Sequence, residues 1–299
     1  MTASSPLPYV VFGVTGRTGA AAADALLREG RPVRVVVRDP AQGRPWAARG
    51  ADVAVADLTD PDSMTRALDR ARGAYVVCPQ HYGRDDLFEH AGLIASTTAR
   101  AAVAAQLPKL VALSSVGADC TSGTGWIGMN RTFEQRLEDT GIPATFLRAA
   151  YFMENWTPLV AQAVRSGTLP SFLAPARRPI PMVATADVGS AAAALLQDEW
   201  TGNHIVALSG PRDYAPNDVA AIVAATLGRP VDVEVLPEAA WPDALAGAGF
   251  SRAALAGFTE MTRGLNGPHI DMKSDPCAIE RAGTTPLEHV IAGLARRTT

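Results

Sequence analysis

The sequence predicts an α/β fold, a doubly wound parallel sheet with a smaller C-terminal α+β unit. Three observations support this prediction. Short apolar runs alternate with helix-forming segments through the first half of the 299-residue chain. The first apolar run leads directly into a turn that contains three glycines. The alternation stops after Tyr151, and proline and glycine become frequent between residues 158 and 181. Regular βαβ repetition implies parallel strands joined by right-handed crossovers.

Six apolar runs have the composition of strands that helices cover on both faces. They are Tyr9–Phe12, Pro32–Val37, Ala51–Ala56, Ala74–Cys78, Lys109–Leu113 and Pro143–Arg148. Helices are expected between them at Ala20–Leu27, Asp39–Arg49, Asp60–Arg70, Arg84–Gln106 and Trp126–Asp139. Asp60 and Pro61 suit the N-cap and the first position of the third helix.

The glycine turn is Gly13-Val-Thr-Gly-Arg-Thr-Gly19. A strand before it and a helix after it form the context that a dinucleotide fingerprint requires. Gly13 lets the chain turn off the strand, Gly16 lets the backbone approach a pyrophosphate, and Gly19 lets the helix pack close to the sheet. The N–H groups of the first helical turn would face the phosphates. An ordinary glycine-rich turn is the alternative, but the flanking elements favour a nucleotide site. The predicted phosphate-binding residues are Gly13, Thr15, Gly16, Arg17, Thr18 and Gly19.

The second half predicts fewer elements. They are a helix at Asp187–Gln197, a strand at His204–Leu208 that returns to the sheet, a helix at Pro216–Leu227, a strand at Val231–Leu236, and then helices rich in glycine and alanine. We therefore predict a Rossmann-type NAD(P)-binding domain over residues 1–156 plus 184–209. Residues 157–183 plus 210–299 would form a smaller substrate-capping domain.

Composition excludes several classes of protein. A hydrophobic content of 47% and a charged content of 19% are globular values, and the net charge of −3 indicates neither nucleic acid nor an anionic membrane as partner. No apolar run approaches the ~18 residues of a membrane span. Residues 1–8 contain no basic residue and no long apolar core, so we expect no signal peptide. A soluble, cytoplasmic protein with a small hydrophobic substrate is expected, and a homo-oligomer or a regulatory protein partner stays open.

The cysteines indicate a reducing setting. Cys78, Cys120 and Cys277 are widely separated and odd in number, and no C-x-x-C pair occurs, so we predict neither a disulfide framework nor a metal site.

Arg38 follows the second predicted strand, 19 positions after Gly19. An acidic residue at this strand end binds the adenosine ribose, whereas an arginine accommodates a 2′-phosphate. Arg17 in the glycine turn could reach the same phosphate. The sequence therefore favours NADP(H) over NAD(H). Asp39 is the competing signal, because a shift of one residue would turn it toward the ribose, and two solvated arginines are the alternative.

Further strand ends border the same crevice. Asp57-Leu58 closes the third strand, where Asp57 could accept the adenine amino group or simply stabilise a turn. Cys78-Pro79 closes the fourth strand, and Cys78 is more consistent with a packing thiol than with a reactive one. Ser114 closes the fifth strand.

Motifs of several enzyme classes are missing. Tyr-x-x-x-Lys, typical of short-chain reductases, does not occur, because the five tyrosines are followed at the fourth position by Gly13, Pro79, Asp86, Asn155 and Asp218. Neither a zinc-protease motif nor a nucleophile elbow is present. Of the five scattered histidines, only His81 falls in an expected cleft loop, and a surface role is favoured for it over a role in the site.

Taken together, several segments resemble the NmrA-like family of atypical short-chain dehydrogenases/reductases over most of the chain. The segments are Gly13–Gly19, Val36-Val-Arg-Asp-Pro40, Leu113-Ser-Ser-Val-Gly117, Glu134 through Arg148, Tyr151-Phe-Met-Glu-Asn155 and Ala184-Thr-Ala-Asp-Val-Gly189. The resemblance implies NADP binding by the glycine turn and Arg38. It also implies that Tyr151 and Phe152 line the nicotinamide side.

One position departs from the family pattern. Family members that reduce substrates usually carry lysine four residues before the glutamate that matches Glu134, and here that position is Asn130. An amide can still hydrogen-bond the nicotinamide ribose, but it cannot act as a cation. The family also contains nucleotide-sensing regulators, and fold analogy does not separate these from enzymes.

Two functions remain after this comparison. The first is an NADPH-dependent reductase of a hydrophobic carbonyl, enone or quinone, with the protein supplying orientation and an apolar pocket. Tyr151 could donate a hydrogen bond to the substrate oxygen, or be a core residue near the hinge. The second is a non-catalytic NADP(H) sensor that acts through a protein partner. Candidate substrate-binding residues are His81, Tyr82, Trp126 and Phe152.

Overall fold

The computed structural model describes residues 6–272 and 277–298. Residues 1–5, part of the segment considered above for a targeting signal, lie outside the described residues. The main sheet contains eight strands, and neighbouring strands in it pair in parallel. They are β1 (Tyr9–Val11), β2 (Val33–Val37), β3 (Asp52–Val55), β4 (Gly73–Val76), β5 (Leu110–Ser115), β6 (Ala144–Ala149), β10 (Asn203–Ser209) and β13 (Ile279–Ala282).

The strand order is β13-β10-β6-β5-β4-β1-β2-β3. The order reverses between β1 and β4, and in open α/β sheets ligands bind outside the carboxyl ends of the strands at such a switch point. The predicted doubly wound parallel sheet is therefore confirmed, and so is the return of the late strand β10 beside β6.

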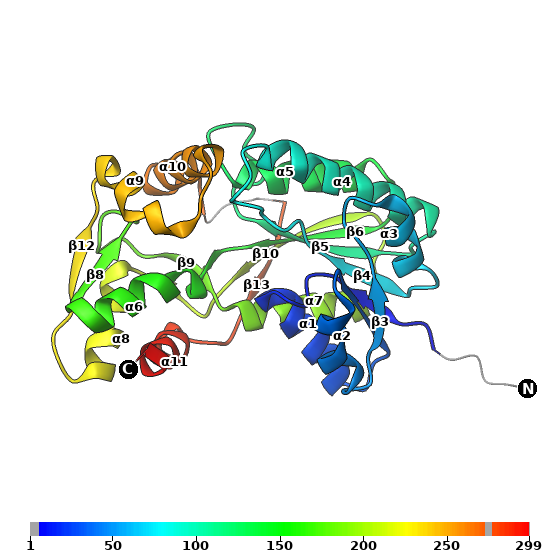
Figure 1. Cartoon of the computed structure of the whole chain (residues 1–299), viewed down its shortest axis with the longest axis horizontal. Coiled ribbons are helices and arrows are strands. Elements are labelled where there is room, and N and C mark those ends of the chain that lie inside the picture. Colours follow the sequence, from blue (N-terminus) through cyan, green and yellow to red (C-terminus); the bar gives the residue numbers. More distant parts are fainter. Residues whose placement is uncertain (1–5, 273–276, 299) are drawn as a thin grey trace, which may run out of the picture.

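Helices cover both faces of this sheet (Figure 1). One layer consists of α1 (Arg17–Arg28), α2 (Pro40–Ala47) and α7 (Thr185–Gln197), and its apolar side chains form one core with the sheet. The opposite layer consists of α3 (Pro61–Leu68), α4 (Leu87–Ala104) and α5 (Ile127–Glu138), which form a second core.

Helix starts follow from local chemistry. The Asp60 carboxylate accepts hydrogen bonds from the N–H groups of Asp62 and Ser63, as expected of an N-cap ahead of a proline. Helix α4 begins at Leu87 rather than at the expected Arg84. Arg84 instead forms a bidentate pair with Asp86, with both N–O distances at 2.7 Å, in the turn that precedes the helix.

Strand β13 corrects the predicted division of the chain, which placed all of residues 210–299 in the capping unit. Its residues pair with β10, from Val206 opposite Ile279 to Ser209 opposite Ala282. All four residues of this edge strand are exposed. Because an exposed strand needs no apolar side chains, the sequence contains no apolar run that would predict it. Asp187 in α7 anchors the connection that follows, because its carboxylate accepts the Thr285 N–H and hydroxyl at 2.8 Å.

The remaining elements form a cap beside the carboxyl ends of the main strands (Figure 1). A three-stranded sheet of β11, β9 and β7 and a two-stranded sheet of β12 and β8 belong to it. Apart from the β13 segment, the division into two domains stays a prediction. The elements are β7 (Tyr151–Phe152), η1 (Met153–Trp156), α6 (Thr157–Ser166), β8 (Thr168–Ser171), β9 (Ile180–Val183), β11 (Asp213–Tyr214), α8 (Pro216–Leu227), β12 (Asp232–Val235), η2 (Glu238–Ala240), α9 (Trp241–Ala244), η3 (Ala246–Ala248), α10 (Arg252–Asn266) and α11 (Leu287–Thr298).

In the part of the chain that the structure describes, no helix is both long enough and apolar enough to span a bilayer.

Candidate functional site

A cavity of about 1110 Å³ lies between the carboxyl ends of the main strands and the cap. It receives residues from the ends of β1, β2, β4, β5 and β6 and from the cap helices, so it occupies the position expected for a ligand site. Every site residue predicted from the sequence except Gly19 lines it. These residues are Gly13, Thr15, Gly16, Arg17, Thr18, Arg38, Asp57, Leu58, Cys78, Pro79, His81, Tyr82, Ser114, Trp126, Asn130, Tyr151 and Phe152.

The glycine turn leaves room for a ligand only at its centre. Gly13 has φ +70°, and a Cβ there would meet Val77 Cγ2 at 2.7 Å. A Cβ on Gly19 would lie 2.3 Å from the carbonyl oxygen of Gly13, so Gly19 serves the packing of helix α1 rather than lining the cavity. A Cβ on Gly16 would meet only that same oxygen, at 3.3 Å.

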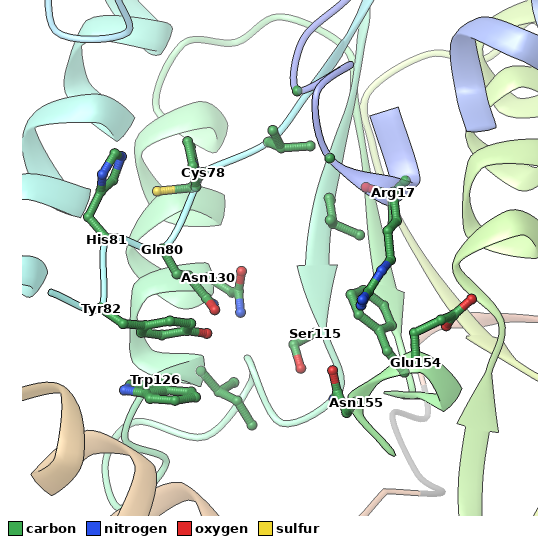
Figure 2. Close-up of a pocket in the computed structure, with 18 of the residues that line it drawn as sticks. Arg17, Cys78, Gln80, His81, Tyr82, Ser115, Trp126, Asn130, Glu154 and Asn155 are labelled. Carbon is green, nitrogen blue, oxygen red and sulfur yellow. The ribbon is translucent and has the colours of Figure 1, made fainter. Parts of the chain in front are cut away.

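The start of helix α1 suits an anion. Its N-cap is Gly16, and no side chain caps the N–H groups of its first turn. Such a helix start offers donors and a positive dipole end to a phosphate. Arg17 extends from this turn into the cavity (Figure 2). The open face at Gly16, the uncapped helix and the guanidinium together fit a pyrophosphate.

The ends of β2 and β3 form one end of the cavity. Asp39 is the N-cap of α2, where its carboxylate accepts the Ala41 N–H at 2.8 Å, while Arg38 lines the cavity. The helix start thus engages the Asp39 carboxylate, and Arg38 is the neighbour that lines the cavity. Asp57 also lines the cavity, and its Oδ1 accepts the N–H and the hydroxyl of Thr59 at 2.8 and 2.7 Å. These bonds, the backbone one first, hold the pKa of Asp57 below its ordinary value.

The side chains that follow β4 point in different directions. Cys78 Sγ donates to the Ala91 carbonyl at 3.9 Å, and burial raises the pKa of this thiol to about 12. Cys78 is thus a packing thiol, as expected. Figure 2 shows Gln80 pointing into the cavity, and His81 and Tyr82 pointing away from each other. The His81 ring packs on His90 of α4, with ring centroids 4.8 Å apart, so a contact of His81 with substrate stays a prediction.

A buried charge network lies behind the end of β5. Ser114 Oγ donates to Glu134 Oε1 at 2.5 Å, and Arg148 donates to both oxygens of Glu134 at 2.9 and 2.7 Å. All three side chains are buried. The Ser114 hydroxyl is therefore already bonded, and the network joins α5 to β5 and β6. Asn130 lies one helical turn before Glu134 and points into the cavity (Figure 2).

Aromatic rings form the opposite wall. Tyr82 stacks on Trp126 with ring centroids 3.9 Å apart, and Phe250 meets the Trp126 ring edge-on at 5.2 Å. Phe258 lies 5.3 Å from Trp126 and Phe172 lies 5.1 Å from Phe258. Burial raises the pKa of Tyr82 above its ordinary value, so its phenol stays protonated. The wall suits a flat apolar molecule.

A loop contact ties this wall to the main sheet. Ser251, the N-cap of α10, donates its N–H to the Tyr82 carbonyl at 2.8 Å and its hydroxyl to the Arg84 carbonyl at 2.7 Å. The Trp126 indole N–H donates to the Ala254 carbonyl at 2.9 Å. The β4–α4 loop and the start of α10 are thus joined across the cavity edge.

Tyr151 lines the cavity between the sheet and the cap. Burial raises the pKa of its phenol to about 12, against a smaller opposing effect of a hydrogen bond with Asn155. The phenol therefore remains protonated and can donate a hydrogen bond. Neighbouring Glu154 accepts the N–H and hydroxyl of Thr185 at the start of α7, at 3.0 and 2.6 Å.

Sequence reasoning missed several lining residues as site residues. Gln80 stands between the predicted residues Pro79 and His81, and Asn155 ends the Tyr151–Asn155 segment of the family resemblance, so both positions could have suggested them. Phe172, Phe250 and Phe258 come from cap segments with no recognisable motif, so only the folded chain brings them to the cavity.

These features define a dinucleotide-binding α/β protein with a capped apolar cavity. The chain belongs to the NmrA-like family, whose model matches residues 9–276. It is 29% identical over 226 residues to the NAD(P)H azoreductase of Xenophilus azovorans, covering 74% of each chain. It is 30% identical over 233 residues to the (4-alkanoyl-5-oxo-2,5-dihydrofuran-3-yl)methyl phosphate reductase of Streptomyces griseus, covering 76% of each.

A solved structure shows the same fold. It is the NADPH-dependent quinone oxidoreductase of Escherichia coli complexed with NADPH, with a TM-score of 0.78 and 23% identity. The alignment covers 96% of this chain and 99% of that one. The predicted family and fold class are both confirmed.

A first prediction concerns the glycine turn. Gly16→Val should abolish nucleotide binding and leave the protein folded, because the new side chain fills the face that a pyrophosphate would approach and meets only one backbone oxygen. Binding is measured by calorimetry and folding by thermal denaturation. Gly293→Val, in open space on α11, is the control that should bind normally. Normal binding by Gly16→Val would show that the phosphates bind elsewhere.

A second prediction concerns the buried network. Glu134→Gln removes the nearer of two negative partners of buried Arg148, the other being Asp119 at 3.8 Å, and should destabilise the protein by roughly 3–5 kcal/mol. Glu138→Gln, on the exposed side of the same helix, should stay within about 0.5 kcal/mol of wild type. Urea denaturation of the three proteins measures the difference. Equal stabilities would show that the pair contributes nothing to folding.

Proposed function

We propose that this protein transfers a hydride from NADPH to a neutral, apolar acceptor, namely a carbonyl, an enone or a quinone. The observation that carries the proposal is the continuity of one cavity, which joins the glycine turn to an aromatic cap wall. The relatives named above are reductases, one of them dependent on NAD(P)H. These comparisons support NAD(P)H-dependent reduction as the activity.

NADP(H) is preferred over NAD(H) in this proposal. Arg38 would hold the 2′-phosphate, because it lines the cavity at the end of β2 while Asp39 is occupied as a helix cap. Arg17 is a second guanidinium that lines the same cavity. A guanidinium presents several donors to a phosphate, which makes arginine suited to this recognition.

The nicotinamide end would be held by neutral groups. The amides of Asn130 and Gln80 both point into the cavity beside the β4 and β5 ends (Figure 2). Asn130 can hydrogen-bond the nicotinamide ribose. When bound, the cofactor supplies the hydride, and the chain orients it and excludes water.

The substrate oxygen would accept a hydrogen bond from Tyr151. Because burial keeps the pKa of this phenol at about 12, it donates the bond without readily losing its proton. A donor of this kind stabilises negative charge that develops on the oxygen during hydride transfer. The site best suits acceptors whose reduced form is stable with a negative charge on oxygen. Solvent can then protonate that oxygen after the hydride transfer.

The cap side of the cavity indicates a neutral substrate. Among the described residues from 157 onward, every side chain that lines the cavity is uncharged, and Gln162 and Thr262 are the polar ones. The Streptomyces griseus relative is named for a phosphate ester. The described cap offers no cation for such a group, so we expect an apolar acceptor instead.

A sensor that binds NADP(H) and acts through a protein partner is the alternative. Asn130 favours it, since reducing members of the family usually have lysine at this position. The size of the cavity beyond the nucleotide residues, and its aromatic wall, favour the reductase.

The cofactor preference gives a third prediction. Arg38→Ala should weaken NADPH binding by roughly tenfold to a hundredfold, the equivalent of a charge-assisted hydrogen bond of about 1.5–3 kcal/mol. NADH binding should change little. Fluorescence titration measures both affinities, with Arg44→Ala on exposed α2 as the control. Equal losses for the two cofactors would remove the 2′-phosphate assignment.

Turnover gives the fourth prediction and tests the proposed function itself. In a broad screen, wild type should oxidise NADPH with at least one quinone or enone faster than the same mixture without protein. Stopped-flow absorbance at the NADPH band measures the rate. Asn130→Lys should change that rate by less than about threefold, because no charged proton donor is needed. Gln135→Lys, exposed on the same helix, controls for the added charge.

Two outcomes would contradict this prediction. Tight NADPH binding with no substrate-dependent oxidation would favour the sensor. A large gain in rate specific to Asn130→Lys would show that the missing cation limits the wild-type reaction.

A further inference from the structure

Two histidines stand at the nucleotide end of the cavity without a role in the proposed reaction. His81 lies in the β4–α4 loop and His90 in the first turn of α4. Their rings meet edge to face with centroids 4.8 Å apart, and both side chains are half-buried and line the cavity. Figure 2 shows His81 directed away from the Tyr82–Trp126 wall.

Three charged side chains surround the histidine pair: Arg38 after β2, Asp57 after β3 and Arg84 in the β4–α4 loop. The Asp57 carboxylate interacts electrostatically with both Arg38 and His90. His81 interacts with Arg38, Arg84 and Asp57 as well as with its partner ring. The pair thus lies within electrostatic range of the arginine proposed to hold the 2′-phosphate.

Two of these charges are already engaged. The Arg84 guanidinium is paired with both oxygens of Asp86, the residue before α4. Asp57 Oδ1 is bonded by Thr59. The titratable neighbours Cys78 and Tyr82 are neutral, because burial raises the pKa of each. Arg38 is therefore the cation that most directly disfavours a positive charge on either histidine.

In the free protein, the surroundings of His81 disfavour its protonated form. Burial, then His90, Arg38 and Arg84 in that order, lower the pKa of His81 below its ordinary value, and only Asp57 acts the other way. A phosphate dianion beside Arg38 would bring negative charge close to the pair. An opposite charge nearby favours the protonated imidazole.

We propose that His81 and His90 belong to the nucleotide site, and that one of them takes up a proton when the 2′-phosphate of NADP(H) binds beside Arg38. The inference rests on the proposed function, because it assumes that Arg38 holds this phosphate. The proton comes from solvent and adds to an imidazole nitrogen, and no covalent bond to the nucleotide forms. The pair supplies the phosphate with a positive charge that depends on pH.

The sign of the pH dependence follows from linkage. Binding raises the imidazole pKa, so affinity is gained as pH falls below the bound-state value and levels off below the free-state value. The ratio of NADP⁺ to NAD⁺ affinity should therefore rise by roughly tenfold from pH 8 to pH 6, the range in which histidine titrates. The phosphate itself has a second pKa of about 6, so its own protonation acts in the opposite direction and must be separated.

The experiment uses NADP⁺ and NAD⁺, which tolerate mild acid, with calorimetry at pH 6, 7 and 8. Two buffers of different ionisation enthalpy give the number of protons taken up. The variants are His81→Gln, His90→Gln and the double variant, which retain polar side chains but cannot carry charge. His204→Gln is the matched control, since this half-buried ring hydrogen-bonds the Thr201 carbonyl at 3.0 Å and is not among the residues that line the cavity.

Wild type and His204→Gln should take up a fraction of a proton with NADP⁺ and none with NAD⁺. The double variant should lose this uptake and keep only the phosphate's own contribution. His90→Lys provides a fixed charge and should bind NADP⁺ with an affinity that no longer rises toward pH 6. Histidine C2–H shifts should move to higher apparent pKa with NADP⁺ for the two cavity histidines alone.

Unchanged proton uptake and an unchanged pH slope in the double variant would overturn the inference while leaving the 2′-phosphate assignment intact. If Arg38→Ala did not weaken NADP⁺ binding, the assignment itself would fail, and the inference with it. These two failures are distinguishable because the first retains a dependence on Arg38.

Discussion

The structure depends on the close approach of strand β1, helix α1 and helix α7. A Cβ on Gly19 would lie 2.3 Å from the Gly13 carbonyl oxygen, and a Cβ on Gly189 would lie 2.3 Å from the Ala21 Cβ. Both contacts are far inside van der Waals distance, so only glycine allows this packing. The helix start is thereby fixed over the switch point of the sheet. This packing therefore positions the uncapped N–H groups of α1, the open face at Gly16 and the Arg17 side chain at the cavity.

The opposite side of the cavity is fixed by charge rather than by close packing. Glu134 and Arg148 are both buried and satisfy each other through two hydrogen bonds, with Ser114 as a third partner. Removing two charges from water is costly, so such a pair is retained where its geometry matters more than its net stabilisation. Here it sets the position of α5 against β5 and β6, and with it the position of Asn130. The polar end of the cavity thus has a rigid support on each side.

Much of the fold could be predicted from the sequence because the responsible signals are local. Six apolar runs, a glycine turn and an Asp-Pro helix start each act over a few residues, and the structure contains all of them. The residues proposed to bind the nucleotide could be placed at the cavity for the same reason, since they follow strand ends. Strand β13 was not, because its exposed residues carry no apolar pattern and its pairing with β10 is decided by the chain that surrounds it. The aromatic wall was only half predictable. Tyr82 follows a recognised strand and Trp126 begins a predicted helix, whereas Phe250 and Phe258 come from the cap, and only tertiary packing brings them to the wall.

The β4–α4 loop joins the two halves of the cavity. His81 is directed toward the nucleotide end, whereas its neighbour Tyr82 stacks on Trp126 in the substrate wall (Figure 2). Ser251 bonds the carbonyl groups of Tyr82 and Arg84, which attaches the same loop to the first turn of α10. A single short segment therefore contacts the proposed 2′-phosphate region, the aromatic wall and the cap. Because loop residues outside regular structure are held mainly by such contacts, the geometry of the substrate wall depends on the same hydrogen bonds that position the histidine pair.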